Sequence, residues 1–220
     1  MTRRQKIGLA IPAFLFAMIG DYLMGINSIG TDRTGNIVWN TIPDWRLAAS
    51  AVLGAICTVL FAIAAIETIK MLENRCPNSK YVKLFKLSNY AGIIFFTFIH
   101  ISICMLLVVF NAGFDATGSV NLASGMLFRV AKSIMLPLAV SFILSDVLVT
   151  VAWCTMVFRH EINLPKWTMI LNPLIIAFIG QAFNLLPLPF FGIDSGFESL
   201  GWLLMYAAIL AEQKGGNHVR

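Results

Sequence analysis

The sequence predicts an all-α fold, a polytopic transmembrane bundle of six helices with both termini in the cytoplasm. Hydrophobic residues make up 58% of the 220 residues and charged residues only 12%, about half the charged share of a soluble domain. The mean hydropathy is +0.80, and the charges gather in short clusters between long apolar runs. These observations exclude a soluble globular protein and predict that residues 1–220 form a single integral membrane domain.

The first half of the chain is predicted to cross the membrane at residues 7–26, 47–69 and 87–110. The first span is expected to be retained, because Asp21 interrupts it and no small-residue cleavage site follows. A polar loop leads to the second span, which is rich in Ala and Gly and would let neighbouring helices approach closely. The connection between the second and third spans carries five basic residues and one acidic residue, which predicts a cytoplasmic loop.

The second half is predicted to cross at residues 133–158, 167–190 and 199–212. We expect an interfacial helix over 121–132 to lead into the fourth span, with a kink near Pro137; one long tilted helix is the alternative. The composition of the fifth span favours a broken or bent helix, and an acidic loop with Asp194 and Glu198 follows. Twelve of the 16 Lys and Arg residues then face the cytoplasm, as expected in a bacterial cytoplasmic membrane.

Three ionisable residues, Asp21, His100 and Asp146, fall well inside predicted spans. Each costs roughly 2.5 to 3.5 kcal/mol on insertion scales, so such residues are usually buried in the bundle or face water. Each lies 14 or 15 residues from a flanking Lys of its span, which places all three at comparable depths. Gln181 and Asn184, spaced i and i+3, add a polar face to the fifth span.

A structural explanation is open for each ionisable residue: Asp21 could bond to backbone, His100 could be a neutral core histidine, and Asp146 could bond to a hydroxyl. We favour a shared site, because functional use is the default for ionisable residues inside a membrane. The leading hypothesis is a cavity, lined by these three residues with Gln181 and Asn184, that binds a small polar or amphiphilic ligand. No ligand spacing such as H-E-x-x-H is present, so no metal or other cofactor is expected.

Two segments and one histidine carry a resemblance to a known family. Gly20-Asp21-Tyr22-Leu23-Met24-Gly25, Asp44-Trp45-Arg46-Leu47 and His100 of the third span resemble a family of bacterial polytopic membrane proteins that is itself functionally uncharacterised. The resemblance covers roughly the first half of the chain. It implies a helical membrane fold and directs attention to Asp21, Trp45, Arg46 and His100, but it implies no activity.

Gly20-Asp21-Tyr22-Leu23 and Ser145-Asp146-Val147-Leu148 also resemble a short pattern of the lysoplasmalogenase family, whose membrane-embedded members cleave vinyl-ether lipids. That resemblance implies a lipid hydrolase in which Asp21 and Asp146 act as acid and base within the bilayer. His100 is a further catalytic candidate.

The same two Asp motifs allow a third interpretation, a proton-coupled transporter. They lie in the first and fourth predicted spans, which run in opposite directions, as corresponding helices of an inverted repeat do. Binding protein, enzyme and transporter therefore stay open. Membrane lipids and a small-molecule or lipid ligand are the expected partners, together with a second copy of the chain through the small-residue second span. The basic residues indicate lipid head groups and not nucleic acid.

Overall fold

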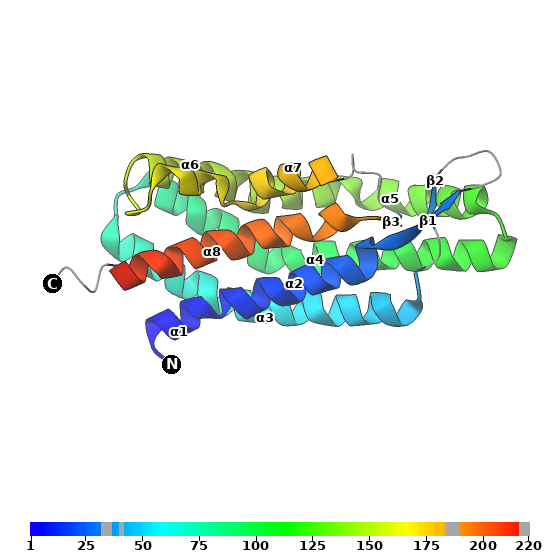
Figure 1. The fold of residues 1–220 in the computed structure, drawn as a ribbon, viewed down its shortest axis with the longest axis horizontal. Coiled ribbons are helices and arrows are strands. Elements are labelled where there is room, and N and C mark those ends of the chain that lie inside the picture. Colours follow the sequence, from blue (N-terminus) through cyan, green and yellow to red (C-terminus); the bar gives the residue numbers. More distant parts are fainter. Residues whose placement is uncertain (32–36, 40–41, 184–189, 216–220) are drawn as a thin grey trace.

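The computed structural model describes residues 1–31, 37–39, 42–183 and 190–215. Over these residues the chain is an elongated, mostly helical bundle with a small sheet toward one end (Figure 1). Four helical segments are long and apolar enough to cross a membrane: Arg3–Gly25, Asp44–Arg75, Lys80–Thr117 and Val120–Phe158. They mark the chain as a membrane-embedded protein, in agreement with its composition.

The described residues contain eight helices with intervening turns. The helices are α1 (Arg3–Gly8), α2 (Ala10–Gly25), α3 (Asp44–Arg75), α4 (Lys80–Thr117), α5 (Val120–Phe142), α6 (Leu148–Phe158), α7 (Pro173–Phe183) and α8 (Phe197–Gly215). Short 3-10 turns precede α7 at Lys166–Ile170 and α8 at Ile193–Gly196. The break between α1 and α2 has a local cause, because Pro12 has no N–H to give to the carbonyl of Gly8.

The stretch after α4 is one continuous helical segment, not an interfacial helix followed by a span. Helices α5 and α6 are joined without interruption by the π-helical residues Ile143–Val147, so the expected separate helix over 121–132 is wrong and the long-helix alternative holds. Pro137 lies inside α5 without ending it. The irregularity falls instead at the π-helical turn, which contains Asp146, and such turns are frequent at functional sites.

The region predicted as a loop between the first two spans contains strands. Strand β1 (Asn27–Thr31) pairs antiparallel with β2 (Ile37–Trp39) and, on its other side, with β3 (Phe190–Phe191). The register sets Gly30 opposite Val38 and Asn27 opposite Phe191. Through the pairing of β1 with β3, this sheet connects the end of α2 to the segment before α8.

The fifth predicted span does not form one long helix among the described residues. Only Pro173–Phe183 is α-helical, and 11 residues rise about 17 Å, well short of the roughly 30 Å apolar layer. The amide oxygen of Asn172 accepts a hydrogen bond from the N–H of Ile175 at 3.0 Å, which caps the start of α7, and Pro173 occupies the first turn, where proline is tolerated. The expectation of a broken fifth segment is consistent with this arrangement.

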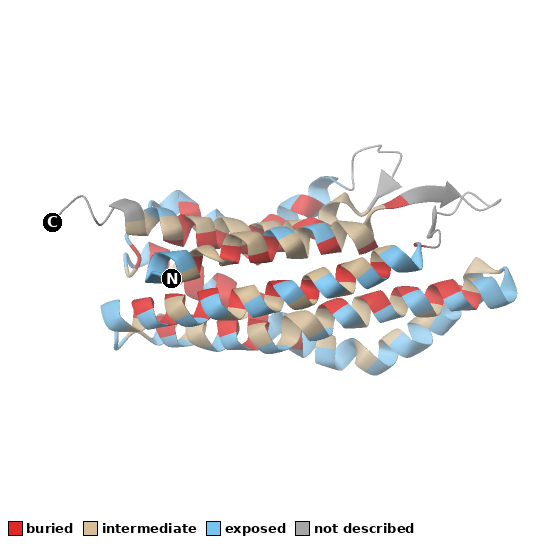
Figure 2. Ribbon diagram, turned by 90° about the horizontal axis from the view of Figure 1, so that it is seen from below, coloured by how far each residue is buried: buried red, intermediate tan, exposed pale blue. Residues whose placement is uncertain are grey.

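The start of α1 and the C-terminal end of α8 lie at the same end of the bundle in both views (Figures 1 and 2). Ion pairs fix this end: Lys6 Nζ lies 3.2 Å from Glu67 Oε1, and Arg75 pairs with Glu212. Lys70 Nζ also lies 3.4 Å from Glu67 Oε1. The buried residues line the inner faces of the helices (Figure 2), and the main core joins α1, α2, α3, α4, α6 and α8.

Candidate functional site

A cavity of about 310 Å³ lies between α2, α3, α4 and α8. Its walls are mainly apolar and its polar lining residues are Asp21, His100, Ser195, Glu198 and Ser199. A volume of this size suits a small ligand. The cavity therefore joins residues from the first, second, third and last helical segments, which are far apart in the sequence.

His100 is seated on the backbone of two glycines. A Cβ placed on Gly54 would lie 2.6 Å from His100 Cδ2, and one on Gly20 would lie 3.1 Å from His100 Nε2. A Cβ on Gly54 would therefore displace the imidazole from this place between α2 and α3, and Gly20 lets the ring approach α2 closely. The Gly that precedes Asp21, and one Gly of the small-residue second span, thus have a specific role in the site.

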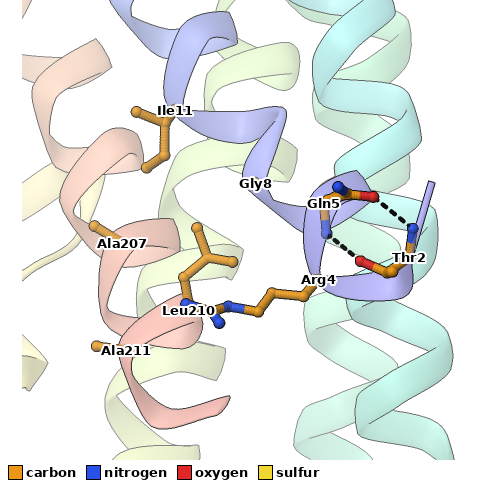
Figure 3. A pocket seen from close by; sticks show the side chains of 8 residues that line it. All are labelled: Thr2, Arg4, Gln5, Gly8, Ile11, Ala207, Leu210 and Ala211. Atoms are coloured by element: carbon orange, nitrogen blue, oxygen red, sulfur yellow. Dashed lines mark hydrogen bonds between the residues drawn. The ribbon is translucent and has the colours of Figure 1, made fainter. Parts of the chain in front are cut away.

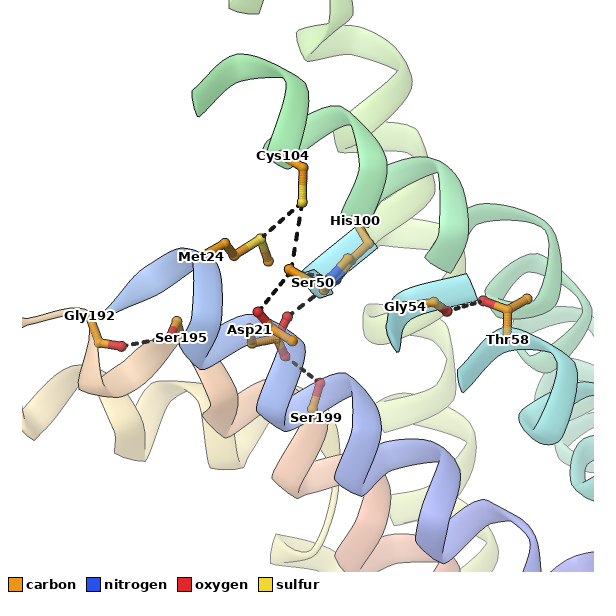
Figure 4. A network of polar contacts seen from close by, with 11 residues as sticks. Asp21, Met24, Ser50, Gly54, Thr58, His100, Cys104, Gly192, Ser195 and Ser199 are labelled. Carbon is orange, nitrogen blue, oxygen red and sulfur yellow. Dashed lines mark hydrogen bonds and ion pairs between the residues drawn. The ribbon is translucent and has the colours of Figure 1, made fainter. Parts of the chain in front are cut away.

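The hydrogen bonds around His100 define its protonated nitrogen (Figure 4). The Ser50 hydroxyl donates to the carbonyl of Gly20 at 2.8 Å and lies 2.8 Å from His100 Nε2. A hydroxyl has one proton, so Nε2 carries the proton of the second contact and donates it to Ser50 Oγ. The other ring nitrogen, Nδ1, is 3.5 Å from Asp21 Oδ1.

Asp21 is held from two sides within the same network. Its Oδ2 accepts a hydrogen bond from the Ser199 hydroxyl at 2.6 Å, and its Oδ1 faces His100. Both side chains are largely buried, with exposed fractions of 13% for Asp21 and 9% for His100. A single proton shared by the carboxyl and the imidazole would satisfy this pair, because Nε2 already carries a proton of its own.

The structure adds Glu198 to the site. The sequence placed this residue in an outer acidic loop, whereas it lies in the first turn of α8 and lines the cavity. Its carboxyl group is hydrogen-bonded to that of Asp146. A hydrogen bond between two carboxyl groups requires a proton on at least one of them.

Asp146 lies behind the cavity lining and is fully buried. Its Oδ1 accepts from Trp202 Nε1 at 2.8 Å, and its Oδ2 accepts from the Ser145 hydroxyl. Glu198 therefore connects Asp146 to the cavity wall that holds Asp21. The structure thus brings Asp21 and His100 into direct contact and reaches Asp146 through one intermediate carboxyl group.

The depth of Glu198 is a signal that the sequence contained. Glu198 precedes Glu212 by 14 residues, the same separation as His100 from Lys86, and Glu212 belongs to the charged end of the bundle. At about 1.5 Å per residue, both side chains lie about 21 Å from that end. Counting from the C-terminal charges would have placed Glu198 beside the other three residues.

The two amide residues proposed for the site have different outcomes. Asn184 lies outside the described residues. Gln181 has an exposed side chain, and its Nε2 donates to Asp194 Oδ2 at 2.5 Å. It is not among the residues that line the cavity around Asp21, so the structure does not bring it to the other predicted site residues.

Aromatic side chains close the cavity toward the charged end of the bundle. Trp202 stacks on Phe14 with 5.5 Å between ring centroids and meets Phe96 edge-on at 5.2 Å. Phe61 is fully buried and meets Trp202 edge-on, with 5.4 Å between ring centroids. Because Trp202 also donates to Asp146, this aromatic cluster fixes the orientation of the carboxyl pair.

The Trp45-Arg46 segment acts at the rim of the site. Arg46 Nη2 donates to the carbonyls of Ile26 at 2.6 Å and Tyr22 at 3.1 Å, so the guanidinium caps the C-terminal end of α2. The Trp45 side chain is largely exposed. Arg46 therefore positions the helix that carries Asp21 and does not line the cavity itself.

The described residues hold no group of three His, Cys, Asp or Glu side chains placed to bind a metal ion. What the site offers is a set of carboxyl, imidazole and hydroxyl groups that are largely buried around a mainly apolar cavity. These groups can bind a cation, accept hydrogen bonds or exchange protons.

A model of a family of unknown function, DUF6796, matches residues 1–214. The chain belongs to this family. The match bears out the expected kinship to an uncharacterised family and extends it from the first half to nearly the whole chain. No curated protein matches the chain, and no solved structure does.

Proposed function

We propose that this member of the DUF6796 family is a multi-pass protein of the bacterial cytoplasmic membrane that binds a small amphiphilic ligand with a cationic head group. The lining of the intramembrane cavity carries this proposal. Its acidic groups are the carboxyl side chains of Asp21 and Glu198, and none of the lining residues in the described part of the chain is Lys or Arg.

The rest of the cavity fits the apolar part of such a ligand. The faces and edges of Phe14, Phe96 and Trp202 belong to its walls, and aromatic rings attract cations as well as apolar groups. A positive head group would lie against Asp21 and Glu198, and an apolar body would contact the rings. The ligand would thereby supply a counter-charge that the surrounding helices lack.

We further propose six crossings with both ends of the chain in the cytoplasm. The ion-paired end of the bundle, which holds the start of α1 and the end of α8 (Figure 1), would face the cytoplasm according to the positive-inside rule. The predicted span over 167–190 would make the fifth crossing, which α7 covers in part, and α8 would make the sixth. The sheet would then lie at the outer side of the membrane.

Two probes with the same aromatic body and opposite charge test the ligand class. Phenylethylamine and phenylacetate would each be titrated into the detergent-solubilised protein while the unfolding temperature is measured. We expect the amine to raise it and the acid to leave it unchanged. The effect should disappear in Asp21→Asn and persist in Asp194→Asn, a control that removes a half-buried carboxyl group that does not line the cavity. No shift with the amine, or an equal shift with the acid, would overturn the proposal.

Proton-coupled transport is a second candidate, favoured by the hydrogen-bonded Asp146–Glu198 carboxyl pair. A carboxyl pair that holds a proton near the middle of a membrane could release it when a cation enters. Uptake of phenylethylamine into proteoliposomes would then respond to an imposed pH gradient and would lose that response in Glu198→Gln. Uptake that ignores the gradient in the wild type would exclude this function.

A further inference from the structure

A second hollow, separate from the carboxyl-lined cavity, lies at the ion-paired end of the bundle. It is a groove of about 660 Å³ between α1 and the start of α2 on one side and the last turns of α8 on the other. Its lining residues are shown in Figure 3. None of them lines the cavity around Asp21. A ligand of that cavity would therefore not fill the groove.

The groove changes from polar to apolar along the helix axes. Arg4 lies at its polar end, and its side chain extends across the opening toward Leu210 (Figure 3). Ile11 and Ala207 lie one to two turns deeper in the bundle and form the apolar part. A phospholipid has the same order, because its charged head group lies at the interface and its acyl chains point inward.

Arg4 is free to bind an anion. The neighbouring cations Lys6 and Arg75 are paired with Glu67 and Glu212, whereas no acidic side chain pairs with Arg4 in the part of the chain that the structure describes. The other polar groups at this end bond to each other: Thr2 N donates to Gln5 Oε1 at 2.8 Å, and Gln5 N donates to Thr2 Oγ1 at 3.2 Å. The guanidinium is thus the group left to meet the ligand.

Small residues keep the groove open. A Cβ on Gly8 would meet no atom within 4 Å, and Ala207 and Ala211 face it from α8 (Figure 3). Larger side chains at these positions would fill the space. The groove is therefore open because Gly8, Ala207 and Ala211 have small side chains or none.

We propose that this groove binds an anionic phospholipid, with the phosphate at Arg4 and one acyl chain along Gly8, Ile11 and Leu210. Basic pockets between membrane helices recognise anionic lipid head groups in this way. The site is independent of the ligand cavity described above. It would fix α1 against α8 through a lipid at a place where the two helices leave a hollow between them.

Native mass spectrometry with defined lipids tests this assignment. The protein would be titrated with phosphatidylglycerol and with phosphatidylcholine of identical acyl chains. We expect the first phosphatidylglycerol to bind about fivefold more tightly than phosphatidylcholine, as a single guanidinium contact allows. Arg4→Gln should abolish this preference and leave both lipids at the phosphatidylcholine level.

Gly8→Leu fills the groove and should prevent tight binding of either lipid. The matched control is Gly125→Leu, because Gly125 of α5 also has open space at its Cβ and lies far from the groove in the sequence; this variant should bind as the wild type does. Wild-type phosphatidylglycerol binding in Gly8→Leu, or equal binding of the two lipids by the wild type, would overturn the proposal. Should Gly8→Leu fail to fold, the Arg4→Gln comparison alone decides.

Discussion

His100 shows how single residues determine the site. The imidazole occupies space that two glycines leave open, contacts Ser50 through Nε2 and Asp21 through Nδ1, and has only 8% of its surface exposed. These contacts come from two helices, Gly20 and Asp21 of α2 and Ser50 and Gly54 of α3. Changes to the glycines should therefore act on the histidine.

Gly54→Ala should destabilise the protein by about 1 to 3 kcal/mol, because the added methyl group would lie 2.6 Å from His100 Cδ2 and overpack the site. Gly125→Ala is the control, since its Cβ meets no atom within 4 Å and alanine favours a helix by about 1 kcal/mol. Thermal unfolding in detergent measures both. An unchanged unfolding temperature in Gly54→Ala would show that His100 is not held against α3.

At residue scale, Asp21 and His100 were predicted as site residues, whereas Glu198 was assigned to a loop and missed. A helix rises by a fixed distance per residue, so a count from a flanking charge gives the depth of a side chain once the helix is recognised. Asp21 and His100 lie inside unmistakable apolar runs. Glu198 follows a segment with Gly, Ser and Asp, which indicated a loop and hid the first turn of α8.

Helix α2 depends at element scale on a cap from another helix. Its last carbonyls accept hydrogen bonds from Arg46 at the start of α3, and hydrogen bonds to charged groups contribute about 1.5 to 3 kcal/mol. The Asp44-Trp45-Arg46-Leu47 segment, recognised from the sequence as a motif, thus acts by fixing the end of α2. Asp21 lies one turn before that end.

Arg46→Ala should lower the free energy of unfolding by about 2 kcal/mol and should speed amide hydrogen exchange at the end of α2. Trp45→Ala serves as the comparison, because its side chain is mostly exposed and makes no such bond. Hydrogen exchange read by mass spectrometry over residues 18–27 distinguishes the two. Equal exchange in both variants would remove the capping role.

Other elements were less accessible to prediction for local reasons. The strands are short, β1 pairs with β3 across most of the chain, and Asn27–Thr31 carries no alternation strong enough to reveal β1. A kink was predicted near Pro137 because proline disrupts helices, whereas the irregular turn lies at Ile143–Val147. Hydropathy identified the apolar helices, but it could not show where α-helical hydrogen bonding gives way to the π-helical turn.

The orientation of the whole bundle can be tested from outside the cell. Asn78, between α3 and α4, and Ala116, at the end of α4, are both exposed at opposite ends of α4. With the native cysteines replaced, Ala116→Cys should react with a membrane-impermeant maleimide in intact cells, whereas Asn78→Cys should react only after lysis. The reverse labelling pattern would contradict the proposed topology.

The whole-molecule account makes the cavity between α2, α3, α4 and α8 a binding site for a cationic amphiphile. The most direct measurement is native mass spectrometry of the protein purified in mild detergent, with wild type, Asp21→Asn and Asp194→Asn prepared alike. The account predicts a defined non-protein mass of a cationic molecule on the wild type and on Asp194→Asn, and its absence from Asp21→Asn. An equal bound mass on all three proteins, or none on the wild type, would contradict it.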